Sequence, residues 1–237
     1  MKTHLPFLTA VALAVAAPSL FAADVTGKVT LKGTPPPEVT IQMDATCGKL
    51  HSAPVTTRHY VTAPDGGLAN VLVYVKSGLS GKTFEPPKET PILDQLNCMY
   101  EPYVMGVMTN QKFKARNSDS FLHNVHPTPK VTGNAEKNAA QPVKGMETEF
   151  SFAKQEILLR IKCDVHPWMF TYVGVVDHPY FAVTGKDGTF KIPNLPPGKY
   201  MIEAYHLKTH GANPGVTQEI TVDGDKKVDF TIEIKGQ

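Results

Sequence analysis

The segment from Cys163 to Met169 constrains this chain more than any other stretch, because it places a thiol, an imidazole and a thioether at the spacing C-x2-H-x2-M. A second imidazole, His123, stands forty positions before Cys163. Soft sulfur donors suit Cu(I), imidazole nitrogens suit Cu(II), and a long axial thioether satisfies neither state fully. A site with these donors can change its charge by one electron with little rearrangement. The segment therefore predicts a copper centre for single-electron transfer.

The residues before Cys163 form a predicted β-strand whose hydrophobic face includes the thiol. Ile157, Leu159, Ile161 and Cys163 share one face, since side chains along a strand alternate with a period of two. A lone cysteine on such a face is ordinarily a small buried hydrophobic residue. A buried thiolate, in contrast, is costly unless a cation compensates it. The histidine and the methionine that follow at loop spacing favour copper as that cation.

Two motifs of the chain resemble those of the cupredoxins, the small blue-copper proteins. The stretch from Asn117 to Val125 is similar to the element that carries the first histidine ligand, and the stretch from Cys163 to Met169 is similar to the loop that carries the other three. The resemblance implies an all-β fold with a Greek-key cupredoxin β-sandwich and a type 1, or blue, site holding one copper ion. It implies these residues: His123, Cys163 and His166 as equatorial ligands, Met169 as a weak axial ligand, and Asn124 as the residue that ties the His123 strand to the cysteine loop.

The axial position is where the chain departs from many cupredoxins. Only Pro167 and Trp168 separate His166 from Met169, and the arm between these two ligands is often longer. The alternative is that Met169 only packs in the core. Two further histidines, His126 and His178, each precede a proline and are expected to lie outside the metal site.

The implied task is electron transfer by a protein that is not an enzyme. Four ligands from protein leave no open position for a substrate. An unidentified redox partner protein would dock through a small, weak interface. His166 would be the edge for electron passage, beside an apolar docking patch of Pro167, Trp168, Phe170 and Tyr172. Two alternatives stay open: a copper-binding or delivery protein that uses the same donors, and a structural β-sandwich protein in which the site is vestigial.

The chain has three cysteines, and an odd number in an exported protein requires an explanation. If Cys163 binds metal as a thiolate, Cys47 and Cys98 are left to pair with each other. We therefore expect a Cys47–Cys98 disulfide.

The N-terminus has the pattern of a secretory signal peptide over residues 1–22: Lys2, an apolar run from Leu5 to Ala17, and small residues at the cut. The alternative, an uncleaved anchor helix, is disfavoured because Pro18 interrupts the run. We expect a periplasmic or secreted protein with no membrane span after cleavage. Without residues 1–22 the chain has 23 basic and 22 acidic residues, since Lys2 is the one charged residue removed from the totals of 24 and 22. This balance argues against nucleic acid as a partner.

In the last part of the chain, short predicted strands alternate with sequences typical of turns, a pattern not seen in the preceding part. The stretch from Asp187 to Tyr200 resembles the transthyretin-like, or carboxypeptidase regulatory-like, β-sandwich module. The expected domains are a copper domain over 23–180 and this smaller β-sandwich over 181–237. The strand at 24–34 resembles the opening strand of the second module, so it is expected to pack with the C-terminal strands. The alternative is two domains in series.

Overall fold

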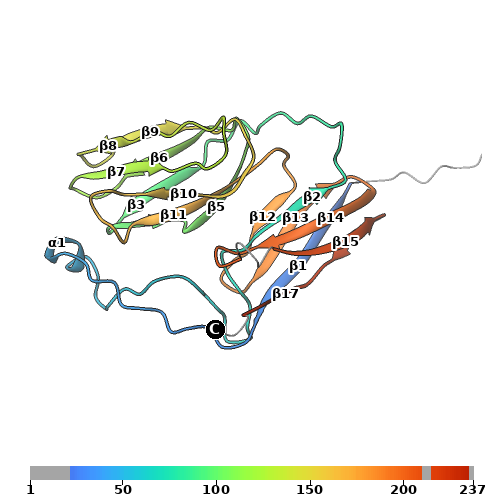
Figure 1. Cartoon of the computed structure of the whole chain (residues 1–237), viewed down its shortest axis with the longest axis horizontal. Helices are drawn as coiled ribbons and strands as arrows, with labels where there is room; N and C mark the ends of the chain where they lie inside the picture. The colour runs from blue at the N-terminus through green and yellow to red at the C-terminus, as the bar shows by residue number, and fades with distance from the viewer. Residues whose placement is uncertain (1–21, 210–214, 235–237) are drawn as a thin grey trace, which may run out of the picture.

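The computed structural model describes residues 22–209 and 215–234, and the fold of this part is all-β. Most of the expected signal peptide, residues 1–21, lies outside the described residues. None of the helices within the described ranges has the length and hydropathy needed to cross a membrane. The strands form two sandwiches, which lie beside each other in Figure 1.

The central sandwich comes from the middle of the chain and consists of two sheets. One has the order β5-β11-β10-β7-β8 and the other β4-β3-β6-β9. Both sheets contribute to one hydrophobic cluster, which includes Leu93, Phe113, Ile161 and Val173. The bounds are β3 (Ile92–Leu96), β4 (Met99–Glu101), β5 (Val104–Met108), β6 (Phe113–Asn117), β7 (His123–Pro127), β8 (Ala139–Gln141), β9 (Glu147–Phe150), β10 (Glu156–Lys162) and β11 (Phe170–Val176).

The terminal sandwich combines strands from both ends of the chain. In one sheet β1 lies between β13 and the short strand β16 and also pairs with β17; the other sheet has the order β12-β2-β14-β15. Its cluster includes Val25, Val73, Ile192 and Phe230. The bounds are β1 (Ala23–Lys32), β2 (Leu72–Ser77), β12 (Phe181–Val183), β13 (Thr189–Leu195), β14 (Gly198–Tyr205), β15 (Val216–Val222), β16 (Lys226–Lys227) and β17 (Phe230–Glu233).

A domain boundary at residue 180 cuts through both sheets of the terminal sandwich. β1 and β2 precede that residue, whereas their pairing partners β12, β13, β14, β16 and β17 follow it. The segment assigned to the copper domain therefore contributes two strands to the other sandwich. The physical reason is that alternation along a strand predicts a buried face without stating which sheet the strand joins.

The two sandwiches meet at β2 and at two paired glycines. Leu72 and Tyr74 of β2 pack with Val176 of β11. Gly174 of β11 lies opposite Gly106 of β5, and a Cβ atom at Gly174 would come within 2.5 Å of the Leu72 side chain. A side chain at this glycine would therefore prevent the close approach of β2.

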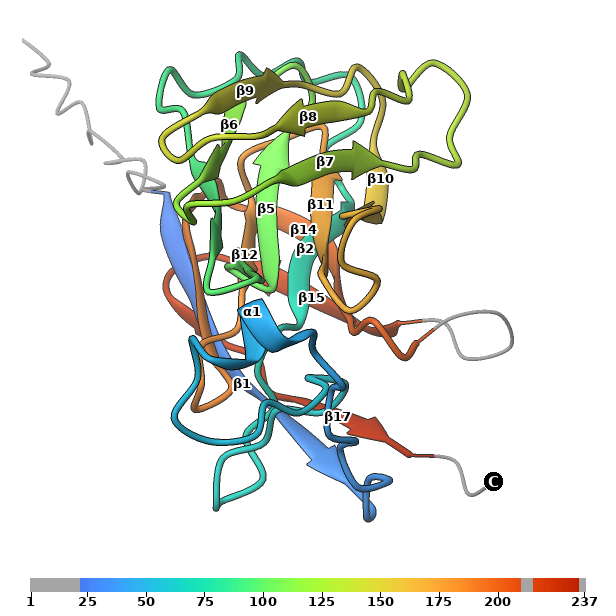
Figure 2. The same cartoon turned by 90° about the vertical axis from the view of Figure 1, so that its left-hand side faces the viewer.

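The connection from β1 to β2 is a long excursion that carries the helix α1 (Ala45–Gly48). Figures 1 and 2 both show α1 next to the lower end of the central sandwich, away from β8 and β9. The Cys47–Cys98 disulfide joins α1 to the turn between β3 and β4. The expected disulfide is thus present, and it holds the excursion against the central sandwich.

Candidate metal centre

Two adjacent strands of the central sandwich deliver the predicted ligands. β7 and β10 pair antiparallel, with His126 opposite Lys162. His123 is the first residue of β7, and Cys163 follows directly after β10. His166 and Met169 lie on the turn from β10 to β11.

Backbone hydrogen bonds close that turn. The Met169 amide donates to the His166 carbonyl at 2.9 Å, and the Cys163 amide donates to the Met169 carbonyl at 2.9 Å. The short arm of two residues is therefore compatible with a compact ligand loop. Met169 itself is fully buried and belongs to the same apolar cluster as Cys163.

Three of the donor groups converge on one buried point. The Nδ1 atoms of His123 and His166 lie 3.0 Å apart, and the Cys163 Sγ lies 3.8 Å from the Nδ1 of His166. All three potential ligand atoms lie within 4.8 Å of one another. These three residues are almost inaccessible to solvent, with whole-residue exposures of 0% for His123, 2% for Cys163 and 6% for His166. Two imidazoles and a thiol at this spacing fit the donor set of a mononuclear copper site.

The electrostatics of His166 favour the form that binds metal. Burial lowers the pKa of His166 below its usual range, and the neighbouring His123 lowers this pKa further. A neutral imidazole is required for coordination. His166 is therefore held in its ligating form at neutral pH.

Asn124 connects the two ligand segments. Its Oδ1 atom accepts a hydrogen bond from the Asp164 amide at 2.7 Å and another from the Cys163 Sγ at 3.3 Å. A second connection comes from Tyr100, whose hydroxyl donates to the Asn124 carbonyl at 2.9 Å. These contacts fix the position of the cysteine loop relative to β7.

Asp119 also contacts the site, although no pattern in the sequence marks it as a site residue. Its Oδ2 atom lies 2.9 Å from the Nε2 of His123. The residue stands within the motif from Asn117 to Val125, four positions before the histidine. A carboxylate on the outer nitrogen is a common partner of a metal-ligating histidine. An acidic residue near a predicted histidine ligand could have been proposed as its partner on this ground. A spacing of four residues in a loop does not by itself show that the two side chains meet.

The edge of His166, which the resemblance implies as the route for electron passage, is largely covered by neighbouring residues. Its side chain is only 7% exposed, and its Nε2 atom lies 3.7 Å from the Oδ2 of Asp44, the N-cap residue of α1. Trp168 packs beside His166, with 5.2 Å between ring centroids, and its indole Nε1 donates to the Cys98 carbonyl. The excursion that carries α1 therefore lies against the imidazole edge of His166.

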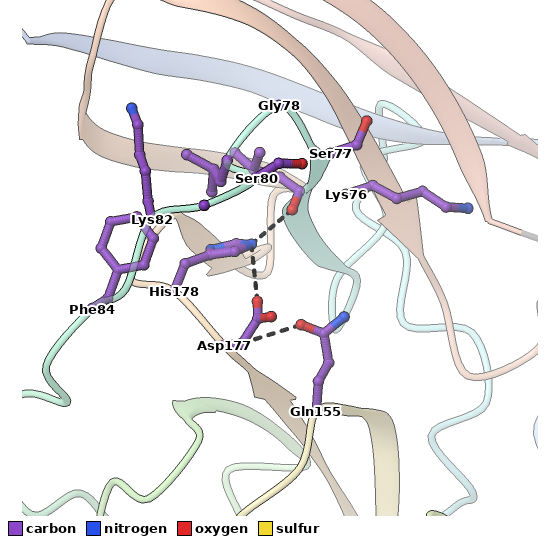
Figure 3. Close-up of a pocket in the computed structure, with 12 residues that line it drawn as sticks. Lys76, Ser77, Gly78, Ser80, Lys82, Phe84, Gln155, Asp177 and His178 are labelled. Atoms are coloured by element: carbon purple, nitrogen blue, oxygen red, sulfur yellow. Dashed lines mark hydrogen bonds and ion pairs between the residues drawn. The ribbon is translucent and has the colours of Figure 1, made fainter.

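The two other histidines lie among other partners. His126 contacts the carboxylates of Asp164 and Glu136 through its two ring nitrogens, each at 2.7 Å. Figure 3 shows His178 in a separate hollow, where its Nε2 atom contacts the Val75 carbonyl at 2.7 Å and faces Asp177. Neither residue belongs to the group formed by His123, Cys163 and His166.

Cys47 and Cys98 also lie close to the ligand histidines. Their Sγ atoms are within 4.8 Å of a ring nitrogen of His166, and Cys98 is similarly close to Asp119 and His123. Both sulfurs are used in the disulfide, so neither offers a thiolate. Cys163 is the free thiol of this region.

Comparisons with known proteins return similar folds without a matching family. No family model matches the chain, and no curated protein matches it. Among solved structures, a copper-containing nitrite reductase from Thermus scotoductus SA-01 aligns at 18% identity with a TM-score of 0.33, over 42% of this chain and 24% of that chain. An oxidised mutant of amicyanin aligns at 20% identity with a TM-score of 0.34, over 44% of this chain and 97% of that chain.

A reduced Cu(I) form of an amicyanin mutant at pH 4 aligns at 22% identity with a TM-score of 0.34, over 42% of this chain and 96% of that chain. These structural neighbours are cupredoxins. The chain spans about a quarter of the nitrite reductase, at 24%, and nearly all of amicyanin. At such identities and scores the alignments carry no argument about chemistry, which must come from the residues of the site.

Proposed function

We propose that this protein binds one copper ion at a type 1 site and carries single electrons. His123, Cys163 and His166 would supply the strong ligands, and Met169 would be the weak axial one. The observation that carries the proposal is the convergence of one thiol and two imidazoles within 4.8 Å in a buried site. Burying these groups together is costly unless a cation compensates the thiolate.

Bound copper would supply the one-electron change between Cu(II) and Cu(I). The residues of the chain provide a fixed and dry setting for that change. Phe121 presents its ring at 5.2 Å from that of His123 and 6.3 Å from that of His166, so it excludes water from both imidazoles. Asn124 and the closed ligand turn restrict movement of Cys163. A site that cannot rearrange suits rapid electron transfer better than a flexible one.

Copper delivery is the competing function, since the same donors serve it. Delivery requires ligands that a partner can reach, whereas the three donors here have exposures of 6% or less. Four protein ligands would also leave no position open for a substrate, so we propose a carrier that is not an enzyme. The proposal includes export to the periplasm or the exterior, and a redox partner protein.

The decisive experiment is a visible absorption spectrum after Cu(II) is added to the purified protein. We expect one equivalent of copper and a strong thiolate-to-copper charge-transfer band. Cys163→Ser should lose the band and most of the affinity for Cu(II) while the protein stays folded. His126→Gln is the matched control, because it changes a histidine of the same strand that contacts carboxylates, and it should keep the band. A spectrum without the band in the unaltered protein, or a band that survives in Cys163→Ser, would refute the site.

A further inference from the structure

Asp119 occupies the outer side of a histidine that the proposed copper site uses. The Nδ1 atom of His123 faces His166, while its Nε2 atom faces the Asp119 Oδ2 at 2.9 Å. A carboxylate oxygen accepts a hydrogen bond from an N–H group, so this contact favours the tautomer of His123 that carries its hydrogen on Nε2. Nδ1 is then left unprotonated, as a ligand atom has to be.

We propose that Asp119 is the positioning residue of this site and holds His123 ready for copper through the outer nitrogen. The expected effects on copper affinity and reduction potential rest on the proposed function. The orientation of the imidazole can also be tested in the metal-free protein.

The carboxylate is itself held in place by the two-residue turn between β3 and β4. The Asn97 amide donates to the Asp119 Oδ1, and the Cys98 amide donates to the Oδ2, both at 2.8 Å. Asn97 and Cys98 connect β3 to β4 with φ angles of 53° and 54°, which are uncommon for residues other than glycine. Asp119 is only 6% exposed. A buried carboxylate with three donors around it has little freedom to leave the histidine.

The Asn97-Cys98 turn is connected to the surroundings of both ligand histidines, His123 and His166. Cys98 is bonded to Cys47 of α1, and the N-cap residue of that helix, Asp44, faces the outer nitrogen of His166. Asp119 thereby links His123 to the same covalently fixed unit that covers His166. The position of the first histidine is set by β3, β4 and α1 as well as by its own strand.

Removal of the carboxylate should weaken Cu(II) more than Cu(I), because a charged partner increases the basicity of the imidazole. Substitution of such partners typically costs about 10- to 100-fold in metal affinity. A tenfold loss confined to Cu(II) corresponds to a rise of about 59 mV in reduction potential for a one-electron couple. We expect Asp119→Asn to show both changes.

The alternative is that Asp119 only closes the turn. Asp94→Asn is the matched control for that role, since Asp94 lies on β3 and bonds to Arg116 and Ser118, with no histidine among its contacts in the described ranges. A structural role predicts similar losses of stability in both variants and an unchanged potential. The positioning role predicts a raised potential in Asp119→Asn alone.

The second measurement is the nitrogen NMR spectrum of the histidine rings in the metal-free protein. The unaltered protein should show the Nε2–H form of His123, and Asp119→Ala should lose that preference. Retention of the Nε2–H form in Asp119→Ala, or a potential in Asp119→Asn equal to that of the Asp94→Asn control, would overturn the proposal. If the unaltered protein bound no copper, the proposed function would fail, while the ring tautomer would still decide the role of Asp119.

Discussion

Both sandwiches bury carboxylates, and two of these, Glu203 and Asp119, differ in their partners. In the terminal sandwich, Glu203 is 3% exposed and bonds to the Tyr74 hydroxyl and to the Lys76 ammonium. In the central sandwich, Asp119 bonds to two turn amides and to a histidine that faces a thiol. Glu203 is neutralised by a lysine of its own sheet. Within the described residues, the Asp119 carboxylate bonds to no lysine or arginine and instead supports a donor group.

This difference teaches how a structural and a functional buried charge can be separated within one molecule. Burial alone does not distinguish them, because both side chains are almost inaccessible. The two carboxylates differ in the groups that their hydrogen-bond partners contact in turn. Glu203 bonds to side chains of its own sheet, whereas Asp119 bonds to His123, which lies close to His166 and to the free thiol of Cys163.

Loss of the disulfide should have the largest effect and should fall on the central sandwich alone. The bond closes a loop with a sequence separation of 51. The chain-entropy estimate for a loop of this size is about 4 kcal/mol of unfolding free energy. We expect the double variant Cys47→Ser, Cys98→Ser to lower the denaturation midpoint of the central sandwich, followed by the near-ultraviolet signal of Trp168. An equal loss in the terminal sandwich would show that the two sandwiches unfold as one unit.

Glu203→Ala should destabilise the terminal sandwich by about 3 kcal/mol, since it leaves the buried Tyr74 hydroxyl without its acceptor and Lys76 without its counter-ion. Copper affinity should not change, and a copper titration beside urea denaturation checks both statements. A change in copper affinity would remove the contrast drawn between the two carboxylates.

Acid should weaken the terminal sandwich through His206. Burial lowers the pKa of His206 to about 4, whereas the unfolded chain has a value near 6.5. Between these values the unfolded state binds the proton and the folded state does not, so stability is complete above about pH 6.5 and falls as the pH approaches 4. The expected loss between pH 7 and pH 5 is about 2 kcal/mol. Urea denaturation at the two pH values measures it, and a His206→Gln variant with an unchanged pH slope would contradict this origin.

Met169→Leu should have the smallest effect on stability, under about 1.5 kcal/mol, because it conserves volume in the core. Its effect on the site is more informative. If Met169 is the axial ligand, the loss of the thioether should raise the reduction potential, and Met169→Gln should lower it because an oxygen donor favours Cu(II). Protein film voltammetry of both variants is the measurement. Potentials that match the unaltered protein would make Met169 a packing residue.

The sequence predicted which side chains converge at the candidate site better than it predicted their surroundings. Spacing and strand alternation predicted that Cys163 and His166 lie together, because these two patterns describe residues that are close along the chain. The Asp119 contact depends on the conformation of one loop, and the cover over His166 depends on pairing of segments 51 positions apart. Patterns of neighbouring residues carry no information on such distances.

β2 shows the same limit for the fold. β2 begins with a run of apolar residues, and Leu72 to Val75 are all buried. The two faces serve different cores: Val73 and Val75 pack within the terminal sandwich, while Leu72 and Tyr74 pack toward the central one. A continuous apolar run predicts burial on both sides without identifying what lies on each side.

The pairing of β2 with β12 has a consequence for protein engineering. These strands flank the central sandwich in the sequence, and they are antiparallel neighbours in one sheet, with Phe181 opposite Tyr74. The chain thus leaves the terminal sandwich and returns to it at adjacent positions, the arrangement in which whole domains can be inserted or exchanged. A short hairpin loop could connect the two strands directly, and the terminal sandwich could then serve as a host for a different domain at the same place.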